Sequence, residues 1–247
     1  MDTNSYNLRL WDKVDAKTLP LNQPFTENML REARNGKPTI HIVFGKPIPS
    51  AWLPENFRGL KILLLAGGGG NLSPLLAATG ADVTVVDSSQ AQLDLDLEVC
   101  ENFNLEINTQ KQDMRDLKLS SEEFDLIINP SSVLYISDPS IVWEQCKRVL
   151  KKDGILITGL VNPTLYLLKE ERETNIVRLN KTEDERKAQE ILPPQFYEHP
   201  HSLNQSIGSL LNAGFNMTNF ESGKWGDGCR IDDYIDSFIS IRCIKQA

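Results

Sequence analysis

One ten-residue segment, Lys61–Gly70 (KILLLAGGGG), constrains the fold of this chain more than any other. Its continuous run of Ile and Leu is typical of a strand that is buried on both faces, as in a parallel sheet. The four glycines that follow remove every side chain from the turn, so its backbone can take positive φ angles and a ligand can lie directly against it. The segment therefore predicts a buried parallel strand that ends in a ligand-binding turn.

The residues after the turn extend this pattern. Leu72–Ala78 is a helical segment whose free N–H groups would point into the turn, and Ala81–Val86 is a second apolar strand that ends at Asp87. The order strand, glycine turn, helix, strand and acid is typical of a half-sheet that binds a nucleoside, with the acid placed to bind the ribose hydroxyls. Two plainer interpretations stay open from the residues alone: a structural turn without a ligand, and an Asp87 that only caps the next helix.

Strands and helices continue to alternate through the middle of the chain. The predicted strands are residues 61–66, 82–86, 106–111, 124–129 and 155–160, and the predicted helices are residues 72–79, 89–103 and 140–151. Alternation at this spacing requires crossover connections, and it predicts an α/β fold with a parallel sheet between two layers of helices.

The residues before the sheet have a different character. Residues 1–58 contain a short predicted helix at Phe25–Arg34 and several prolines, and they are expected to form an N-terminal cap or lead-in outside the sheet. Residues 59–247 are then expected to form the main domain.

A charged insertion interrupts this main domain at about residues 162–200. It contains predicted helical stretches at Lys169–Glu173 and Lys181–Glu190, and it is either a solvated surface segment or a lid over the ligand. A helix through Leu211 and two more strands, residues 215–220 and 237–244, are expected after it.

Composition excludes several classes of function. The net charge of −8, from 34 acidic and 26 basic residues, argues against a nucleic-acid-binding surface because an acidic protein repels phosphates. The chain has no run of 18 apolar residues and its first six residues are polar, so we expect neither a membrane span nor a signal peptide, and a cytoplasmic location. The four cysteines are scattered without a C-x-x-C pair, which indicates reduced thiols and no metal site.

Several segments, in one order and at one spacing, carry a resemblance to a known family. They are Trp52–Pro54, Leu63–Gly70, Gly80–Ser89 with Gln92 and Leu93, Gln112–Leu117, Phe124–Pro130, Arg148–Leu156, and His201–Leu203 leading to Ala213–Phe215. With them the chain resembles the class I S-adenosylmethionine-dependent methyltransferases over about residues 45–244, and within these a small bacterial, methyltransferase type 11-like group. The resemblance implies a Rossmann-like, seven-stranded, mostly parallel sheet with helices on both faces, whose last strand runs antiparallel beside strand five.

The resemblance also implies a site for S-adenosyl-L-methionine, which would leave as S-adenosylhomocysteine. The residues that it assigns to the cofactor are Ala66, Gly67, Gly68 and Gly70 in the turn, Asp87 and Ser88 at the ribose, Gln92 nearby, Gln112, Asp113 and Met114 at the adenine, and Asn129 and Pro130 beside the methyl group. From the residues alone, Asp113 can also be a surface acid and Met114 a core residue. The chain departs from the family pattern at three positions, where Ala66 and Gln112 replace glycines and Leu64 replaces an acid.

The acceptor side of the site is less well defined by the sequence. His201 matches a family position at the mouth of the crevice, where it would contact the substrate or accept a proton, or else cap and pack. Tyr135 is either a wall of the site or an ordinary surface or core aromatic residue. His41 is expected to pack in an apolar stretch, and Trp11 and Trp52 are expected to close the N-terminal cap or to cover the cofactor.

These features predict an enzyme that moves the methyl group of S-adenosylmethionine to a small-molecule acceptor by in-line displacement. Two alternatives stay open: a non-catalytic protein that binds the same cofactor as a sensor, and a nicotinamide-dependent oxidoreductase. The dinucleotide pattern G-x-G-x-x-G fits poorly, because reading it from Gly68 puts Ser73 at the third glycine and reading it from Gly67 puts Leu72 there. The identity of the acceptor and the oligomeric state are not predicted.

Overall fold

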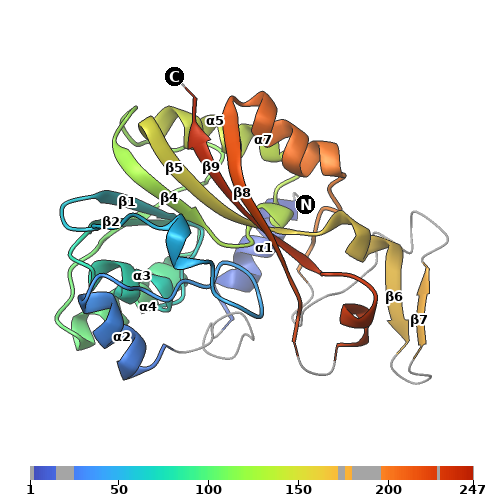
Figure 1. Ribbon diagram of the computed structural model, residues 1–247, viewed down its shortest axis with the longest axis horizontal. Coiled ribbons are helices and arrows are strands. Elements are labelled where there is room, and N and C mark those ends of the chain that lie inside the picture. Colours follow the sequence, from blue (N-terminus) through green and yellow to red (C-terminus); the bar gives the residue numbers. More distant parts are fainter. Residues whose placement is uncertain (1–2, 15–24, 172–175, 180–195, 227–228, 247) are drawn as a thin grey trace.

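The computed structural model describes residues 3–14, 25–171, 176–179, 196–226 and 229–246. Its centre is a seven-stranded sheet in the order β3-β2-β1-β4-β5-β9-β8 (Figure 1). The strands are β1 Lys61–Leu65, β2 Asp82–Asp87, β3 Asn108–Lys111, β4 Phe124–Asn129, β5 Leu150–Val161, β8 Phe215–Gly223 and β9 Phe238–Lys245. Strands β1 to β5 are parallel, and β9 pairs antiparallel with both β5 and β8. The predicted α/β sheet with an antiparallel last strand beside strand five is thus confirmed.

Helices cover both faces of this sheet. They are α1 Thr3–Trp11, α2 Glu27–Arg34, α3 Leu72–Ala77, α4 Gln90–Asn102, α5 Pro139–Val149 and α7 Ser209–Asn212, with a π-helical turn at Asn204–Gly208 and short 3₁₀ turns at Ser50–Trp52, Val133–Tyr135, Pro163–Leu167 and Arg230–Asp233. One apolar cluster joins α2, α3 and α4 to one face of the sheet, and a second cluster joins α5 and α7 to the other face. Helices α2, α3 and α4 gather below the sheet in Figure 1, and α5 and α7 lie above it.

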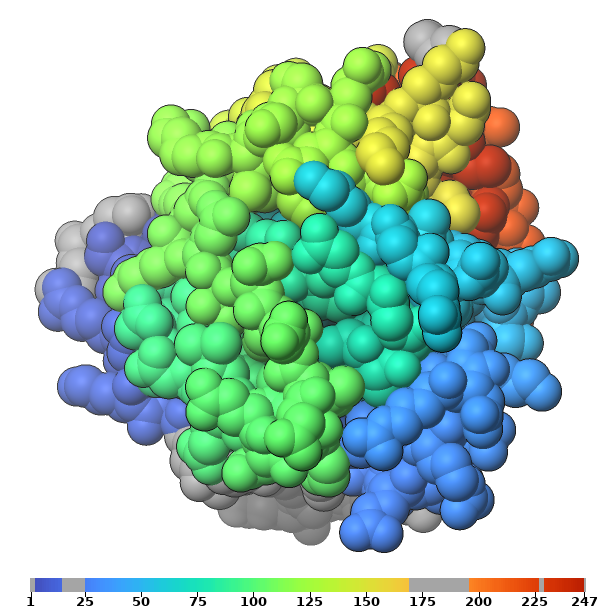
Figure 2. All heavy atoms as spheres, turned by 90° about the vertical axis from the view of Figure 1, so that its left-hand side faces the viewer, coloured from blue at the N-terminus to red at the C-terminus, as the bar shows by residue number. Residues whose placement is uncertain are grey.

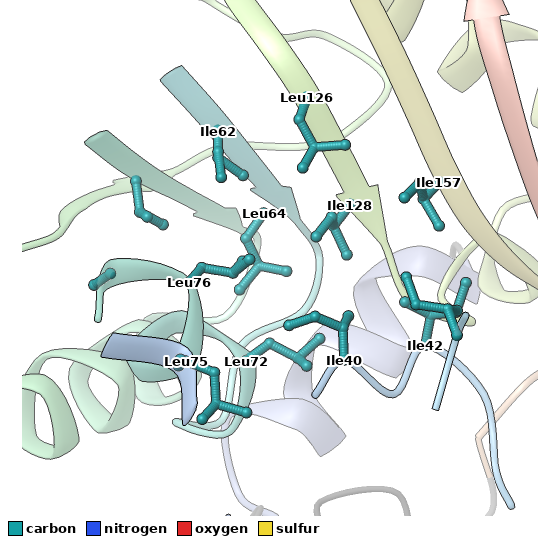
Figure 3. Packing of buried hydrophobic residues seen from close by; sticks show 14 of the residues in the cluster. Ile40, Ile42, Ile62, Leu64, Leu72, Leu75, Leu76, Leu126, Ile128 and Ile157 are labelled. Carbon is teal, nitrogen blue, oxygen red and sulfur yellow. The ribbon is translucent and has the colours of Figure 1, made fainter. Parts of the chain in front are cut away.

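Strand β1 shows why the sheet is placed between two layers. Ile62 and Leu64 pack in the first cluster, whereas Leu63 and Leu65 pack in the second. All four side chains have 0% of their surface exposed. The run is apolar without interruption because each face of the strand packs against a layer of helices. Figure 3 shows Ile62 and Leu64 facing α3 residues, among them Leu75 and Leu76.

The segment before β1 packs against the carboxyl ends of β4 and β5. Ile40 and Ile42 are buried in the first cluster, and Figure 3 shows them below Ile128 and Ile157. The carbonyl of Ile42 accepts a hydrogen bond from the Ser131 N–H at 3.1 Å, and the carbonyl of Ile40 accepts one from the Ile48 N–H at 2.9 Å. This segment belongs to no strand.

Two helical elements differ from the predictions. Helix α1 was not predicted, because its only buried residue is the polar Asn7 and its sequence lacks a clear apolar stripe. Helix α5 ends at Val149, and Lys151 and Lys152 already belong to β5. Figure 2 shows the dark-blue atoms of α1 at the edge of the molecule, against green atoms from the middle of the chain.

The insertion also differs where it is described. Leu168–Glu171 is strand β6 and pairs antiparallel with β7, Ile176–Leu179, so the helix predicted over Lys169–Glu173 is wrong. Lys and Glu favour helices weakly, and this preference is overcome here by strand pairing with a segment that contains Ile176 and Val177. The second predicted helix, Lys181–Glu190, lies outside the described residues.

Candidate active site

The glycine turn between β1 and α3 is compressed between the sheet and α4. A Cβ on Gly68 would lie 2.7 Å from Gln92 Cβ and 3.1 Å from Asp87 Oδ2, so this position has no room for a side chain. Ala66 opens the turn with a φ of 51°, in the left-handed region that normally favours glycine. Its N–H donates to the Val86 carbonyl at 2.7 Å, which holds the start of the turn beside the end of β2.

A buried carboxylate from α4 holds the rest of the turn. Asp96 is 0% exposed, and its carboxylate accepts hydrogen bonds from the Gly69 N–H at 3.2 Å, the Gly70 N–H at 3.0 Å and the Ser73 hydroxyl. Burial raises the pKa of Asp96 to about 7, although these hydrogen bonds act in the opposite direction. The sequence analysis missed Asp96. The one hint of its burial is its position three residues after Leu93, which places both residues on the same face of the helix.

Asp87 ends β2 directly beside the turn. Its Oδ1 accepts from the Ser89 N–H at 2.9 Å and its Oδ2 from the Gly68 N–H at 3.4 Å. Burial raises the pKa of Asp87 to about 6, against the lowering effect of these backbone hydrogen bonds. The N-cap of α4 is Ser89, whose hydroxyl accepts from the Gln92 N–H, so capping is not the role of Asp87.

A first cavity of about 230 Å³ lies over this turn. It brings together eight of the residues predicted for the cofactor: Ala66, Gly68, Asp87, Ser88, Gln92, Gln112, Asp113 and Met114. Gln92 donates through Nε2 to the Trp11 carbonyl at 3.1 Å, while its buried Oε1 has no hydrogen-bond partner among the described residues. The acceptor that the chain presents at this cavity is therefore the Asp87 carboxylate, with the buried Gln92 Oε1 behind the wall.

Asp113 already has a partner within the chain. Its carboxylate accepts from Arg115 Nε at 3.0 Å and from the Arg115 N–H at 2.9 Å, and both residues line the first cavity. Partial burial acts to raise the pKa of Asp113, but the hydrogen bonds and charge of Arg115 outweigh it and hold the pKa below its usual value. The carboxylate is thus ionised and fixed in orientation at this end of the cavity.

Helix α1 closes the first cavity from the side opposite the sheet. Asn4, Ser5, Asn7, Leu8 and Trp11 all contribute to the lining. Asn7 exchanges two hydrogen bonds of 2.8 Å with the backbone N–H and carbonyl of Tyr197, near the end of the insertion. The Trp11 ring stacks on Phe196 with centroids 4.4 Å apart. Two segments that are about 190 residues apart in the chain therefore close the site together.

Three of the residues predicted for the cofactor support the site from outside its lining. Gly70 packs against α4, where a Cβ would lie 2.8 Å from Val99 Cγ2, and Gly67 packs in the same way against Leu64 and Pro130. Asn129 is 0% exposed and donates to the Leu65 carbonyl at 2.9 Å and to Ser132 Oγ at 2.7 Å, while its Oδ1 accepts from Thr158 at 3.0 Å. Asn129 thus ties the carboxyl ends of β1, β4 and β5 together.

A second, larger cavity of about 580 Å³ adjoins the first. Trp11, Ala66, Ser132 and Tyr135 line both cavities, so these four residues mark the junction between them. Pro130 lines the second cavity only, as does His41 from the segment before the sheet. His41 is half-buried at this cavity, so the expectation that it simply packs in an apolar stretch is corrected.

The two candidate catalytic residues are placed very differently. Tyr135 lies at the junction, and burial raises the pKa of its phenol well above the ordinary value. His201 is buried and is not among the described residues that line either cavity; its Nε2 lies 2.7 Å from the Ile136 carbonyl. Because a carbonyl only accepts, Nε2 carries the proton, and burial lowers the pKa of the ring.

One further acid near the junction escaped the sequence analysis. Glu198 accepts from the Tyr166 hydroxyl at 3.4 Å, and burial raises its pKa to about 7. Its charge also contributes to the raised pKa of Tyr135. Nothing in the local sequence of the insertion signals a buried acid at this position. Within the described ranges, no group of three or more His, Cys, Asp or Glu side chains is placed to bind a metal.

Comparison with known proteins identifies the family of this chain. The family model "Methyltransferase domain" matches residues 63–158, which contain the turn, Asp87 and Asp113. An uncharacterized methyltransferase of Bacillus subtilis (strain 168), YbaJ, is 34% identical over 98% of this chain and 98% of its own length. The chain therefore belongs to the class I S-adenosylmethionine-dependent methyltransferases, and S-adenosylmethionine is its methyl donor.

Two more distant proteins show how far the similarity extends. A ubiquinone biosynthesis O-methyltransferase of Cereibacter sphaeroides is 32% identical over 44% of this chain and 44% of that protein, so the chain matches less than half of its length. The structure of geranyl diphosphate C-methyltransferase from Streptomyces coelicolor A3(2), solved with Mg²⁺, geranyl diphosphate and S-adenosyl-L-homocysteine, is similar at a TM-score of 0.63. It is 14% identical over 99% of this chain and 98% of that chain, and this likeness is one of fold.

Proposed function

We propose that the protein transfers the methyl group of S-adenosylmethionine to a small-molecule acceptor, with the cofactor in the first cavity and the acceptor in the second. The observation that carries this proposal is the junction at Trp11, Ala66, Ser132 and Tyr135, where the two cavities meet. Methyl transfer requires the acceptor atom, the methyl carbon and the sulfur to lie in one line with water excluded, and a junction between two cavities suits that geometry.

For the cofactor we propose a position across the carboxyl ends of the strands. Asp87 would accept hydrogen bonds from the ribose hydroxyls, the backbone at Ala66 and Gly68 would lie under the methionine part, and Met114 would pack on the adenine. Asp113 would accept from the adenine amine while Arg115 fixes its orientation. Support comes from the common lining of one cavity by these residues and from the Asp87 carboxylate, which has only backbone N–H partners among the described residues.

The chemistry then needs little from the protein beyond placement. The sulfonium of the cofactor is already activated, so the acceptor atom gives an electron pair to the methyl carbon while the carbon–sulfur bond breaks and its electrons stay on sulfur. An acceptor that bears a proton also needs a group to receive that proton. We propose that Tyr135 forms the wall at the transfer point, and that His201 positions the residues after β4 through its bond to Ile136.

The size of the second cavity supports a small molecule as the acceptor. Its volume of about 580 Å³ lies within the range of about 300–1,000 Å³ that is typical of small-molecule sites. The partial likeness to ubiquinone biosynthesis O-methyltransferases supports the same class of acceptor. A sensor that only binds the cofactor has no need for a second cavity at the methyl group.

The remaining parts of the chain fit this proposal. We propose that residues 1–58 act as a cap and that residues 59–247 form the catalytic domain, with the insertion at about 162–200 helping to select the acceptor; support comes from the contacts of Asn7 and Trp11 with Tyr197 and Phe196. We place the protein in the cytoplasm, supported by the buried thiols of Cys100, Cys146 and Cys243. Among the described residues, no helix is both long enough and apolar enough to cross a membrane.

The proposed cofactor site is tested by Asp87→Ala, with Asp82→Ala at the exposed start of the same strand as the control. Loss of the hydrogen bonds to a charged acceptor should cost about 1.5–3 kcal/mol of S-adenosylhomocysteine binding, which is about a 10- to 100-fold rise in Kd. Isothermal titration calorimetry measures both variants, and Asp82→Ala should bind like the wild type. An unchanged Kd in Asp87→Ala would show that the ribose lies elsewhere.

Catalysis itself is tested by transfer of a tritiated methyl group from the cofactor to fractions of a bacterial metabolite extract. At least one fraction of small molecules should gain label with the wild-type protein. Tight cofactor binding together with no transfer to any fraction would favour the non-catalytic sensor.

A further inference from the structure

Aromatic rings form much of the wall of the second cavity. Phe25, Phe44 and Trp225 line it on one side, and Trp11 and Tyr135 line it at the junction with the first cavity. The rings of Phe44 and Trp225 pack with their centroids 4.4 Å apart, and both rings also contact Phe238, which is not among the residues that line the cavity. Walls of this kind favour a flat, apolar molecule, because aromatic groups gain both buried area and ring contacts there.

The same cavity offers no counter-charge to a charged ligand. Among the described residues that line it, there is no Asp, Glu, Lys or Arg. An ionised group that is buried without a partner costs several kcal/mol, so both anions and cations are disfavoured in this cavity. Uncharged polar groups are present instead, and the buried Ser131 Oγ and Asn71 Nδ2 have no hydrogen-bond partner in the described part of the chain.

His41 is the basic group of this cavity. Its neighbours Ile40 and Ile42 are 0% and 1% exposed and pack in the core, whereas His41 itself lines the cavity. The backbone here is held by the hydrogen bonds of Ile42 to Ser131 and of Ile40 to Ile48. The same backbone lies against Gly159 of β5, where a Cβ would be only 2.4 Å from the Ile42 carbonyl oxygen.

The state of the His41 ring suits proton transfer. Within the described residues, no hydrogen bond is made by either of its ring nitrogens. Burial lowers the pKa of His41 below its usual value, so the ring is neutral near pH 7 and one nitrogen keeps a free lone pair.

We propose that the acceptor is an uncharged phenol that carries a further polar substituent, and that His41 receives the proton of the phenolic hydroxyl. This inference rests on the proposed function, because it assigns the second cavity to the acceptor. The phenolic oxygen forms a bond to the methyl carbon as the carbon–sulfur bond breaks, and the sulfur keeps that electron pair. The O–H proton goes to the free nitrogen of His41, and the imidazolium then releases it to water. Ser131 and Asn71, which are part of the cavity wall, would lie beside the second substituent.

The charge preference is tested by binding of three matched catechols to the protein saturated with S-adenosylhomocysteine. The probes are 4-methylcatechol, which is neutral, 3,4-dihydroxybenzoate, an anion, and dopamine, a cation. Quenching of tryptophan fluorescence reports binding because Trp11 and Trp225 line the cavity. The neutral probe should bind at least about tenfold more tightly than either ion. Equal or tighter binding of an ion would overturn the proposed class of acceptor.

The role of His41 is tested by His41→Gln, with His199→Gln as a histidine control that is not among the described residues lining the cavity. Loss of a general base should lower kcat for 4-methylcatechol by about 100-fold. The loss in kcat should be much smaller for 4-nitrocatechol that binds in its neutral form, because its more acidic hydroxyl gives up a proton with less help from a base. The Kd for S-adenosylhomocysteine should not change in either variant, and His199→Gln should keep the wild-type kcat.

The outcomes separate this inference from the proposed function. An unchanged kcat in His41→Gln, or the same loss for both catechols, would overturn the proton-accepting role. Binding of S-adenosylhomocysteine without methylation of any probe would overturn the phenol class while leaving the cofactor site intact. Failure to bind S-adenosylhomocysteine at all would instead contradict the proposed function itself.

Discussion

Asp87 couples cofactor binding to pH. Burial raises its pKa to about 6, and only the ionised carboxylate can accept hydrogen bonds from both ribose hydroxyls. Affinity for S-adenosylhomocysteine should therefore rise with pH up to about 6 and level off above it, with a change of up to about tenfold per pH unit below that value. Calorimetry between pH 5 and 7.5 measures this, and Asp87→Asn should abolish the dependence. The same pH dependence in wild type and variant would assign it to another group.

Asp96 makes a different kind of prediction, because it holds the turn rather than the ligand. Asp96→Asn removes part of the acceptor capacity that serves Gly69, Gly70 and Ser73, so it should lower the free energy of unfolding by roughly 1–3 kcal/mol. The control is Asp94→Asn, on the exposed side of the same helix. Urea unfolding measures both, and equal stability of the two variants would contradict the role given to Asp96.

The same residue also sets a pH dependence of stability. Burial raises the pKa of Asp96 from an ordinary value of 3.8 to about 7. Between about pH 4 and pH 7, Asp96 is therefore mostly protonated in the folded state and mostly ionised in the unfolded state. Its contribution to stability is thus greatest below about pH 4 and declines as the pH rises towards 7. Asp96→Asn should reduce this decline, which unfolding at pH 5 and pH 8 measures; an unaltered decline would assign it to other acids.

At this scale the sequence indicated many of the residues that line the first cavity, but it missed the acids that support them from behind. The glycine turn, Asp87 and Met114 stand in a local pattern of strand, turn and strand end that is visible in one dimension. Asp96 and Glu198 stand in no such pattern. An acid in a helix or in a charged insertion is ordinarily solvated, so neither residue was expected to be buried. Only the packing around them, which depends on residues distant in the chain, makes these acids buried.

At the scale of elements, α1 acts as a cover that its own sequence does not explain. Its hold on the site depends on Asn7, which exchanges two hydrogen bonds with the backbone of Tyr197. Asn7→Ala should remove both hydrogen bonds to the Tyr197 backbone, loosen the cover and raise the Kd for S-adenosylhomocysteine by about tenfold. Calorimetry measures affinity and hydrogen exchange measures the opening of α1. Arg9→Ala, on the exposed side of α1, should change neither, and an Asn7→Ala variant that behaves like it would show that α1 is not a cover.

The central elements were predictable and the added ones were not. The strands β1, β2 and β4 are apolar on both faces, and the helices between them follow at regular spacing, so their pattern survives without tertiary information. Helix α1 and the β6–β7 hairpin lack such a pattern. Their structure depends on partners elsewhere in the chain: α1 contacts residues near the end of the insertion, and β6 pairs with β7.

At the scale of the whole molecule, the order of the strands determines where the site lies. The parallel strands β1 and β2 end at the glycine turn and at Asp87, while β4 and β5 end beside the segment that carries His41. The sheet therefore places the proposed cofactor site and the proposed acceptor site on the same edge, at the switch point of its strand order. The fold class followed from the alternation of strands and helices, but the second cavity did not, since its walls come from Trp11, from residues 25–45, from 66–75, from 130–135 and from Trp225.

The most direct measurement is a crystal structure of the protein with S-adenosylhomocysteine bound. The ribose should lie at Asp87, the homocysteine chain should cross Gly68, and the sulfur should face the second cavity between Ala66, Ser132 and Tyr135. A ligand that lies outside the first cavity, or one whose sulfur points away from the second, would contradict the placement of donor and acceptor on either side of this junction.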